Sequence, residues 1–308
     1  MQVTVHAQLS LIRSPEDNLT LEQILMNIDI PITRTVHKTA LIQNDIFTVY
    51  HREMQIENLI RKSLENNTLE VCYQPIYDIH SKKIKSAEAL VRLHDAEIGS
   101  ISPEEFIPIC EKNGLIIQLG EFVFDTVCHD YMTFEFEKKG IEYVEVNLSV
   151  VQCMNTELSE SFEKIISKYQ ISPSHINLEI TESAAVSNQT ILSRSVSNLQ
   201  KMGFSFSLDD YGTGYSNYTY MYSLPFNLIK LDKSILWLAT ENENNYILLQ
   251  STIEMLHKMN YHIVCEGVEK EEQVKLLQKL NCDYLQGFYF SRPVAPDVFL
   301  AFVKAYND

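Results

Sequence analysis

The sequence is poor in glycine and proline, which number nine each among 308 residues. So few chain-breaking residues, together with a hydrophobic content of 45%, argue against a disordered or low-complexity protein. The six cysteines lie far apart and form no C-x-x-C pair, so we expect neither a disulfide framework nor a zinc site. Reduced thiols are typical of cytoplasmic proteins, and we predict that location.

Basic residues are also scarce, with 25 Lys and Arg against 41 Asp and Glu, for a formal charge of -16. This balance argues against a protein that binds polymeric nucleic acid through a broad basic surface. No apolar run is long enough to span a bilayer, and the start MQVTVHAQLS has no cleavable signal pattern, so we expect no membrane contact. An anionic ligand would need local help from cations held by clustered acids.

From residue 69 onward, short strand-like runs alternate with amphipathic helical stretches. Eight such runs are present: 69–79, 83–93, 144–150, 176–183, 204–211, 228–235, 262–269 and 283–290. This alternation is typical of α/β proteins with a mostly parallel sheet, and about 240 residues suit a TIM-type (β/α)8 barrel. A doubly wound open sheet is the alternative.

The first two runs are separated only by the short turn IHSK. So few residues cannot form a helical crossover, so the two runs should pair as an antiparallel hairpin. We therefore predict a barrel with an antiparallel first strand. Among the helical stretches, EFVFDTVCHDYMTFEFEKKG is expected to stop at Gly140 and SRSVSNLQKMG at Gly203.

Residues 1–63 have a different character. VTVHAQLSLI is a candidate strand, LTLEQILMNIDIPITRTVHK begins like a helix, and FTVYHREMQIENLIRKSLENN suggests a strand leading into a charged connecting helix. These elements are too few for an independent core, so we predict a short N-terminal α/β segment over 1–63 and a barrel domain over 64–308.

Polar residues interrupt the apolar runs near their C-terminal ends, where α/β barrels build their active sites. Seven of the eight runs contribute one or more: Glu88, Asn147, Glu179 and Glu182, Asp209 and Asp210, Lys230 and Asp232, Glu266 and Glu269, and Gln286. A single carboxylate there could cap a helix. Capping does not explain the whole set.

Clustered carboxylates repel one another, and this repulsion raises their pKa values unless cations are present. Oxygen ligands without His or Cys suit hard ions, so we expect Mg²⁺ or Mn²⁺. The adjacent pair Asp209 and Asp210 would let one carboxylate bridge two ions while the other binds one. Such two-metal sites are typical of phosphodiester hydrolysis.

Several of these segments resemble, in order and spacing, the motifs of EAL-type cyclic di-GMP phosphodiesterases: SAEALVRL, VEVNLS, LEITES, LDDYGTGYSN, IKLDKS, CEGVE and LQGFYFSRP. The resemblance covers roughly residues 65 to 308. It implies a barrel with an antiparallel first strand and hydrolysis of cyclic di-GMP to linear pGpG.

The resemblance also implies roles for individual residues around two Mg²⁺ or Mn²⁺ ions. The implied ligands of one ion are Glu88, Asn147, Glu179 and Asp209, while Asp209 and Asp210 serve the second. Glu266 is similar to the family's further acid near the second ion, proposed as a general base, and Lys230 would position or polarise the attacking water. Glu88 and these last two form the expected catalytic group.

On the substrate side, the resemblance implies contacts from Gln74, Arg92 and Gln286. Glu182 and Glu269 would anchor the loop GTGYSN, which the family links to dimerisation, so a homodimer is expected. Departures from the family pattern occur at Tyr211, Asn217 and Leu93, and none removes an implied metal ligand.

Residues 1–63 resemble the closing part of a GGDEF-type diguanylate cyclase domain. The glycine-rich signature and metal-binding acids of such a domain are absent from the sequence, so we predict no cyclase activity. The alternative is a plain N-terminal extension packed on the barrel.

Three functions fit these patterns. The first is a working phosphodiesterase, the second a catalytically silent cyclic di-GMP receptor or scaffold, and the third a barrel hydrolase acting on another phosphodiester. A degenerate receptor would be expected to lack some ligands or Lys230. All of them are present, which favours the enzyme.

Overall fold

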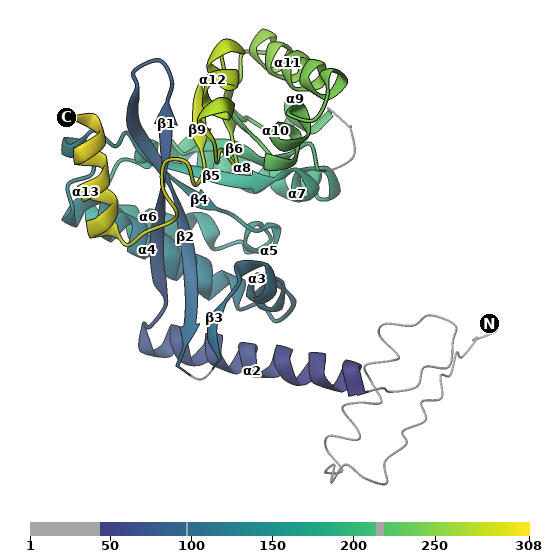
Figure 1. Ribbon diagram of the computed structural model, residues 1–308. Helices are drawn as coiled ribbons and strands as arrows, with labels where there is room; N and C mark the ends of the chain where they lie inside the picture. Colours follow the sequence, from purple (N-terminus) through teal and green to yellow (C-terminus); the bar gives the residue numbers. More distant parts are fainter. Residues whose placement is uncertain (1–43, 97, 214–218) are drawn as a thin grey trace, which may run out of the picture. The chain divides into compact units, whose positions relative to one another are not determined.

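The computed structural model describes residues 44–308, apart from residue 97 and residues 214–218 (Figure 1). The chain divides into two compact units, Met1–Arg61 and Lys62–Asp308. Helix α2 (Asn44–Asn66) is the described part of the first unit and continues into the second. The elements expected within residues 1–43 lie outside the described residues, and the division of the chain at residue 63 stays a prediction.

The segment 47–67 begins as a helix, so our prediction of a strand at its start is wrong. The residues FTVY belong to α2. Aromatic and β-branched residues favour strands only weakly, whereas the stretch that follows is rich in strong helix formers, and a nucleated helix propagates. An ion pair one turn apart, with Arg61 Nη2 2.7 Å from Glu57 Oε1, adds local support.

Eight strands close into a barrel, and each overlaps one of the eight runs indicated by the sequence (Figure 1). They are β1 (Glu70–Asp78), β2 (Lys83–Asp95), β4 (Tyr143–Asn147), β5 (Ile176–Thr181), β6 (Ser205–Tyr211), β7 (Leu228–Leu231), β8 (His262–Cys265) and β9 (Tyr284–Gln286). The order is β1-β9-β8-β7-β6-β5-β4-β2, and β1 pairs with β2 to close the ring. The predicted barrel is confirmed, and the open-sheet alternative is wrong.

The first strand runs antiparallel to both of its neighbours, β2 and β9, as the sequence predicts. The other barrel pairings are parallel. The Asp78 carboxylate stabilises the tight turn between β1 and β2 by accepting the backbone N–H of His80 at 2.8 Å. A short strand that we did not anticipate, β3 (Gly99–Ile101), pairs with the far end of β2.

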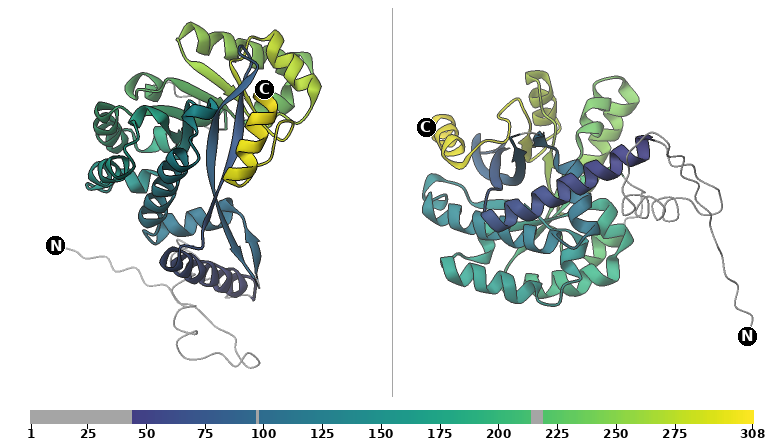
Figure 2. Two further views of the ribbon diagram at one scale, coloured as in Figure 1. Left: turned by 90° about the vertical axis from the view of Figure 1, so that its left-hand side faces the viewer. Right: turned by 90° about the horizontal axis from the view of Figure 1, so that it is seen from below.

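Helices lie around the strands of the barrel (Figure 2). They are α3 (Pro103–Lys112), α4 (Ile116–Thr133), α5 (Val150–Cys153), α6 (Leu158–Tyr169), α7 (Glu182–Ser187), α8 (Gln189–Met202), α9 (Thr219–Ser223), α10 (Lys233–Ala239), α11 (Glu243–Lys258), α12 (Glu271–Lys279) and α13 (Pro296–Asn307). In the part of the chain that the structure covers, no helix combines the length and apolar character needed to cross a bilayer.

The two predicted helix ends have different outcomes. Helix α8 stops at Gly203, which adopts φ 105 as a left-handed cap. Helix α4 ends at Thr133, earlier than expected, and Gly140 instead caps a short 3-10 turn. The chain leaves α4 because Phe136 is fully buried, with its ring centroid 5.3 Å from that of Tyr73.

One side of the barrel interior is apolar. Ile76 of β1, Leu228 of β7 and Val264 of β8 form a buried cluster, against which Tyr284 packs. Strands β1 and β7 are not neighbours in the sheet, so these side chains meet inside the barrel. Side chains two residues apart share a face of a strand, so Lys230, two residues beyond Leu228, also points inward but nearer the C-terminal end.

The backbone of β9 passes very close to the segment that follows β8. A Cβ atom on Gly287 would lie 2.1 Å from Val268 O and 2.3 Å from Val268 N. In turn, the backbone N–H of Val268 donates to Gln286 O at 3.0 Å. Only glycine permits this approach, which fixes Gln286 and the segment carrying Glu266 beside each other.

We expect Gly287→Ala to lower the free energy of unfolding by about 3 kcal/mol, because a rigid backbone group must move to admit the methyl group. Urea unfolding followed by circular dichroism measures this loss. The matched control is Gly114→Ala: a Cβ atom there meets nothing within 4 Å, although φ is 73, so about 1 kcal/mol of backbone strain is expected. Equal losses in the two variants would contradict the close-approach argument.

Candidate active site

A single lysine lies at the centre of the polar end of the barrel. Lys230 projects from β7 and its side chain is 0% exposed. Its Nζ atom lies 2.7 Å from Glu179 Oε1 and 2.9 Å from Glu266 Oε1. A buried ammonium is tolerated only when opposite charges compensate it, so the surrounding carboxylates define this region electrostatically.

Five carboxylates lie within 4.0 Å of the Lys230 ammonium, and they come from separate parts of the barrel. Their closest oxygens are those of Glu179 at 2.7 Å, Glu266 at 2.9 Å, Glu88 at 3.2 Å, Asp209 at 3.5 Å and Glu145 at 3.7 Å. Four of these five residues are in the set that the sequence singled out. The closed barrel therefore brings together side chains that are as much as 178 positions apart, from Glu88 to Glu266.

Glu88 is the carboxylate with the most hydrogen-bond donors among these. Asn147 Nδ2 donates to its Oε1 at 3.1 Å, and Gln286 Nε2 donates to its Oε2 at 2.7 Å. Burial alone would raise the pKa of Glu88, but Lys230 and these amide donors together lower it. Glu88 is thus held as an anion at the mouth of the barrel.

Gln286 also connects Glu88 to the first strand. Its Nε2 lies 3.3 Å from Gln74 Oε1, and Gln74 Nε2 donates to the backbone oxygen of Ser291 at 3.2 Å. The structure therefore brings Gln74 and Gln286, two of the expected substrate-contacting residues, directly beside Glu88.

The other buried carboxylates lack such donors. Among the described residues, both oxygens of Glu145 and Glu179 and Oδ1 of Asp209 accept no hydrogen bond of good geometry. Burial, reinforced by the neighbouring carboxylates, raises the pKa of all three, and that of Glu179 well above its usual range. One ammonium is too little positive charge for this group.

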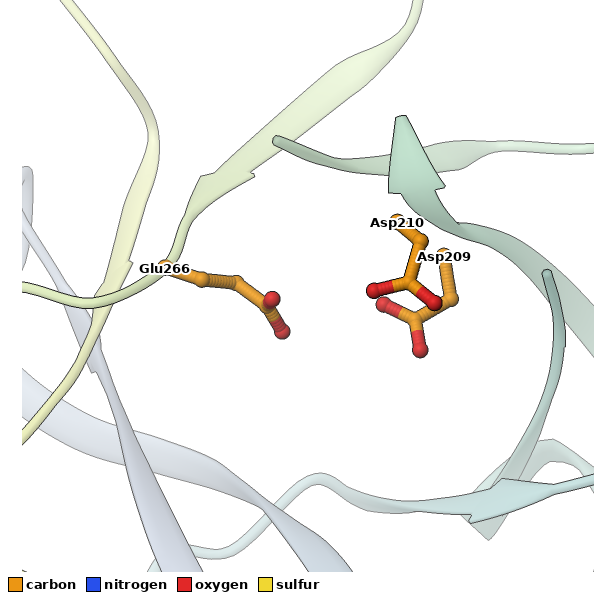
Figure 3. A group of neighbouring side chains, drawn as sticks. All are labelled: Asp209, Asp210 and Glu266. Atoms are coloured by element: carbon orange, nitrogen blue, oxygen red, sulfur yellow. The ribbon is translucent and has the colours of Figure 1, made fainter. Parts of the chain in front are cut away.

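Adjacent residues on a strand normally point to opposite sides, but Asp209 and Asp210 point to the same side (Figure 3). The cause is local: Asp210 adopts φ 57, and the pairing of β6 with β7 shifts register between Leu208 and Tyr211. Such an irregularity redirects a side chain, and aspartate tolerates the left-handed conformation better than most residues.

Asp209, Asp210 and Glu266 offer oxygens that all lie within 4.8 Å of one another (Figure 3). Burial first, and then the neighbouring carboxylates, raise the pKa of Asp210 to about 6 and that of Glu266 to about 8. Carboxylate oxygens at this spacing fit a hard divalent cation such as Mg²⁺ or Mn²⁺, which would relieve the repulsion that raises these pKa values. The residues present therefore fit the expected ions, although their roles as ligands stay predictions.

Glu182 lies where a loop anchor is expected. Its Oε2 accepts the backbone N–H of Gly212 at 2.9 Å, and the Tyr220 hydroxyl donates to its Oε1 at 2.7 Å. Gly212 and Tyr220 stand on either side of residues 214–218, which lie outside the described residues. Glu182 thus holds both flanks of the segment that follows the paired aspartates.

Arg92 and Glu269 lie farther from the carboxylate cluster. Arg92 shares a face of β2 with Glu88 but is four residues farther along, and its Nη1 donates to Val91 O at 3.0 Å. Glu269 is exposed, and its backbone N–H donates to Gln273 Oε1 of α12 at 2.8 Å. Their expected roles, phosphate binding and loop anchoring, stay predictions.

A cavity of about 870 Å³ opens beside the cluster. Its lining includes Glu88, Asn147, Glu179, Asp209 and Asp210. It also includes apolar side chains of α3, α4 and α5, such as Ile107, Leu119 and Val151. Its size and mixed lining suit a ligand with both an anionic and an apolar part.

Sequence reasoning missed Glu145. This side chain is 0% exposed and belongs to β4, two residues before Asn147. The two-residue period of a strand places both on the same face, so an inward-pointing Asn147 already indicates an inward-pointing Glu145. Glu145 lies in the middle of the strand, away from the C-terminal end where barrel sites are expected.

The part of the chain that carries these residues is similar in sequence to known proteins. Residues 57–293 match the sequence profile of the EAL domain. Signaling protein YkoW of Bacillus subtilis is 33% identical over 248 residues, which make up 80% of this chain and 31% of YkoW. The bifunctional diguanylate cyclase/cyclic di-GMP phosphodiesterase MucR of Pseudomonas aeruginosa is 29% identical over 306 residues, covering 98% of this chain and 45% of MucR. The chain spans less than half the length of these curated relatives.

Two solved structures also resemble this chain in fold. The PaMucR phosphodiesterase in its c-di-GMP complex matches with a TM-score of 0.75 and 32% identity, covering 80% of this chain and 99% of that one. The FimX EAL domain from Pseudomonas aeruginosa bound to c-di-GMP matches with a TM-score of 0.71 and 18% identity, covering 78% and 96%. At 18% identity the likeness to FimX is one of fold alone.

The raised pKa values predict an unusual pH dependence. In the presence of a chelator such as EDTA, we expect the free energy of unfolding to fall as the pH rises from 5 to 8. The pKa of Glu266 is raised from its ordinary value of 4.5 to about 8, so the folded protein keeps a proton that the unfolded chain loses. Stability from this group is therefore complete below pH 4.5 and is lost as the pH approaches 8.

Urea titrations in EDTA at several pH values within this window measure the slope. Glu266→Gln is the matched variant: it removes this titrating group, so its slope should be shallower than that of the wild type. A free energy of unfolding that stays constant or increases between pH 5 and pH 8 would show that the pKa of Glu266 is not raised in the folded protein.

Proposed function

The chain belongs to the EAL domain family, and on that premise we propose that it is a divalent-metal-dependent phosphodiesterase that hydrolyses cyclic di-GMP to linear pGpG. The observation that carries this proposal is the carboxylate cluster around Lys230, which opens onto a cavity of about 870 Å³. Support for the substrate comes from the PaMucR phosphodiesterase, 32% identical to this chain and solved in complex with c-di-GMP.

In this proposal Glu88, Asn147, Glu179 and Asp209 hold one Mg²⁺ or Mn²⁺ ion, and Asp209 and Asp210 hold a second, with Glu266 beside it. Such ions, when bound, stabilise the charge on the reacting phosphate and lower the pKa of water. The oxygens of Asp209, Asp210 and Glu266, which lie within 4.8 Å of one another, support the second assignment. The shared closeness of Glu88, Glu179 and Asp209 to Lys230 Nζ supports the first.

The chain's own residues have separate tasks. The ammonium of Lys230 can donate a hydrogen bond to the attacking water and orient it, because it is fixed in the barrel by its carboxylate neighbours. Glu266, 2.9 Å from that ammonium, would accept the proton that the water loses when it is ionised, the form that a neighbouring divalent cation favours. Water oxygen bonds to phosphorus, the bond from phosphorus to the 3′ oxygen breaks, and that oxygen gains a proton from solvent.

On the substrate side, we propose that Arg92 binds a phosphate, because its rigid guanidinium carries a permanent charge. Gln74 and Gln286 keep Glu88 oriented through the amide contacts described above. The apolar side chains of α3, α4 and α5 that line the cavity offer a surface for a guanine base.

Three further expectations stay proposals. We propose a cytoplasmic protein that acts as a homodimer, and a segment over residues 1–63 that ends a GGDEF-type domain without cyclase activity. The curated relatives are much longer than this chain, so the activity of the whole protein is part of the proposal.

The experiment is a hydrolysis assay with purified protein, cyclic di-GMP and either Mn²⁺, Mg²⁺ or EDTA, with products separated by chromatography. We expect pGpG only with a divalent cation. Glu88→Gln should reduce kcat/KM by at least about 100-fold, the size expected for loss of a group in the reacting centre.

The matched control is Glu142→Gln, another single charge removal, on an exposed glutamate whose Oε1 lies 2.8 Å from Lys85 Nζ outside the site. It should leave kcat/KM unchanged. Tight binding of intact cyclic di-GMP without turnover would make the protein a receptor, and turnover only of another phosphodiester would overturn the proposed substrate.

A further inference from the structure

Among the residues that the structure describes, Glu145 is the one carboxylate within 4.0 Å of Lys230 that the proposed function does not use. It is 0% exposed, neither of its oxygens accepts a hydrogen bond of good geometry from the described residues, and its Oε2 lies 3.7 Å from Lys230 Nζ. A buried carboxylate whose oxygens accept no hydrogen bond is costly to keep, so its retention inside the barrel asks for a function.

Glu145 lies beside Glu88 of β2, its partner in the sheet, but below two of the other proposed ligands. It precedes Asn147 by two residues on β4 and lies opposite Asn177 of β5, whereas Asn147 lies opposite Glu179. Glu145 is therefore one inward-facing step deeper in the barrel than the pair Asn147 and Glu179, which face the cavity.

Divalent cations and the Lys230 ammonium compete for the same oxygens. Five carboxylates lie within 4.0 Å of Nζ, and the proposed function places four of them at or beside the ions: Glu88, Glu179, Asp209 and Glu266. Once these oxygens face metal ions, a fully buried ammonium still needs a counter-charge. Glu145 is the carboxylate left within reach.

We propose that Glu145 is the resident counter-ion of Lys230, a positioning residue that holds the ammonium on the inner side of the site while divalent cations occupy the other carboxylates. This inference rests on the metal dependence in the proposed function. It assigns Glu145 to the lysine and not to the ions, and it explains why a carboxylate is buried below the cavity within reach of Lys230.

The test measures Mn²⁺ binding by isothermal titration calorimetry at pH 6.5, without cyclic di-GMP. For Glu145→Gln we expect the Kd for Mn²⁺ to rise at least 10-fold, on the order of one lost charge contact, because Lys230 then stays on the ligand oxygens. In EDTA the variant should be no less stable than the wild type, since four carboxylates still surround Lys230. A merely structural role would instead lower stability in EDTA and leave the Kd unchanged, and that result overturns the proposal.

Loss of a negative charge could also weaken Mn²⁺ binding directly. A double-mutant cycle with Lys230→Met separates the two causes. If Glu145 acts through the lysine, Glu145→Gln should have no effect on the Kd for Mn²⁺ in the Lys230→Met background. An equal loss of affinity in both backgrounds would show direct action on the ions and overturn the proposal.

Two further variants complete the design. Glu145→Asp keeps the charge and should bind Mn²⁺ with a Kd within about 3-fold of the wild type, whereas a loss as large as that of Glu145→Gln would show that charge at this position is not what matters and overturn the proposal. Asp130→Asn, a buried carboxylate bonded to the Tyr73 hydroxyl at 2.8 Å outside the barrel, controls for buried charge removal and should leave the Kd unchanged. Wild-type protein that binds no Mn²⁺ would refute the proposed metal dependence, whereas equal affinity in wild type and Glu145→Gln would refute only this inference.

Discussion

The interaction on which the site depends is the sharing of one buried ammonium by five carboxylates. Lys230 has no exposed surface and lies within 4.0 Å of acids from β2, β4, β5 and β6 and from the segment after β8. No single pair among these would repay the removal of two charges from water. Taken together they supply more carboxylate oxygens than one ammonium can pair with, and these oxygens are what suits the site to hard divalent cations.

The barrel makes this arrangement possible because its closure brings distant strands to one lumen. The apolar cluster of Ile76, Leu228 and Val264 fills the interior on one side, so charged groups gather at the C-terminal ends of the parallel strands. Close backbone contacts such as that of Gly287 with Val268 then fix the segments that carry Gln286 and Glu266. The site is therefore rigid where the carboxylates meet.

Much of this could be predicted from the sequence. The eight strands were recognisable because buried parallel strands read as short apolar runs, and the turn IHSK was too short for anything but a hairpin. The positions of Glu88, Glu179, Asp209 and Lys230 followed from the rule that barrel sites form at strand ends.

What the sequence did not reveal depends on three-dimensional context. The left-handed conformation of Asp210 and the register shift beside it come from the pairing of β6 with β7, which no local pattern encodes. Glu145 was missed because its importance comes from Lys230, 85 residues away. The start of α2 was misread because the weak strand preference of FTVY gave way to the helix that follows it.

The most direct test of this account is the stability of Lys230→Met in EDTA at pH 8, measured by urea unfolding. Methionine keeps the length of the side chain but removes its charge, so the surrounding carboxylates would be left without their shared cation. The account predicts a loss of about 3–5 kcal/mol in the free energy of unfolding, the cost of leaving buried charges uncompensated. A variant as stable as the wild type under these conditions would show that Lys230 does not hold the cluster together.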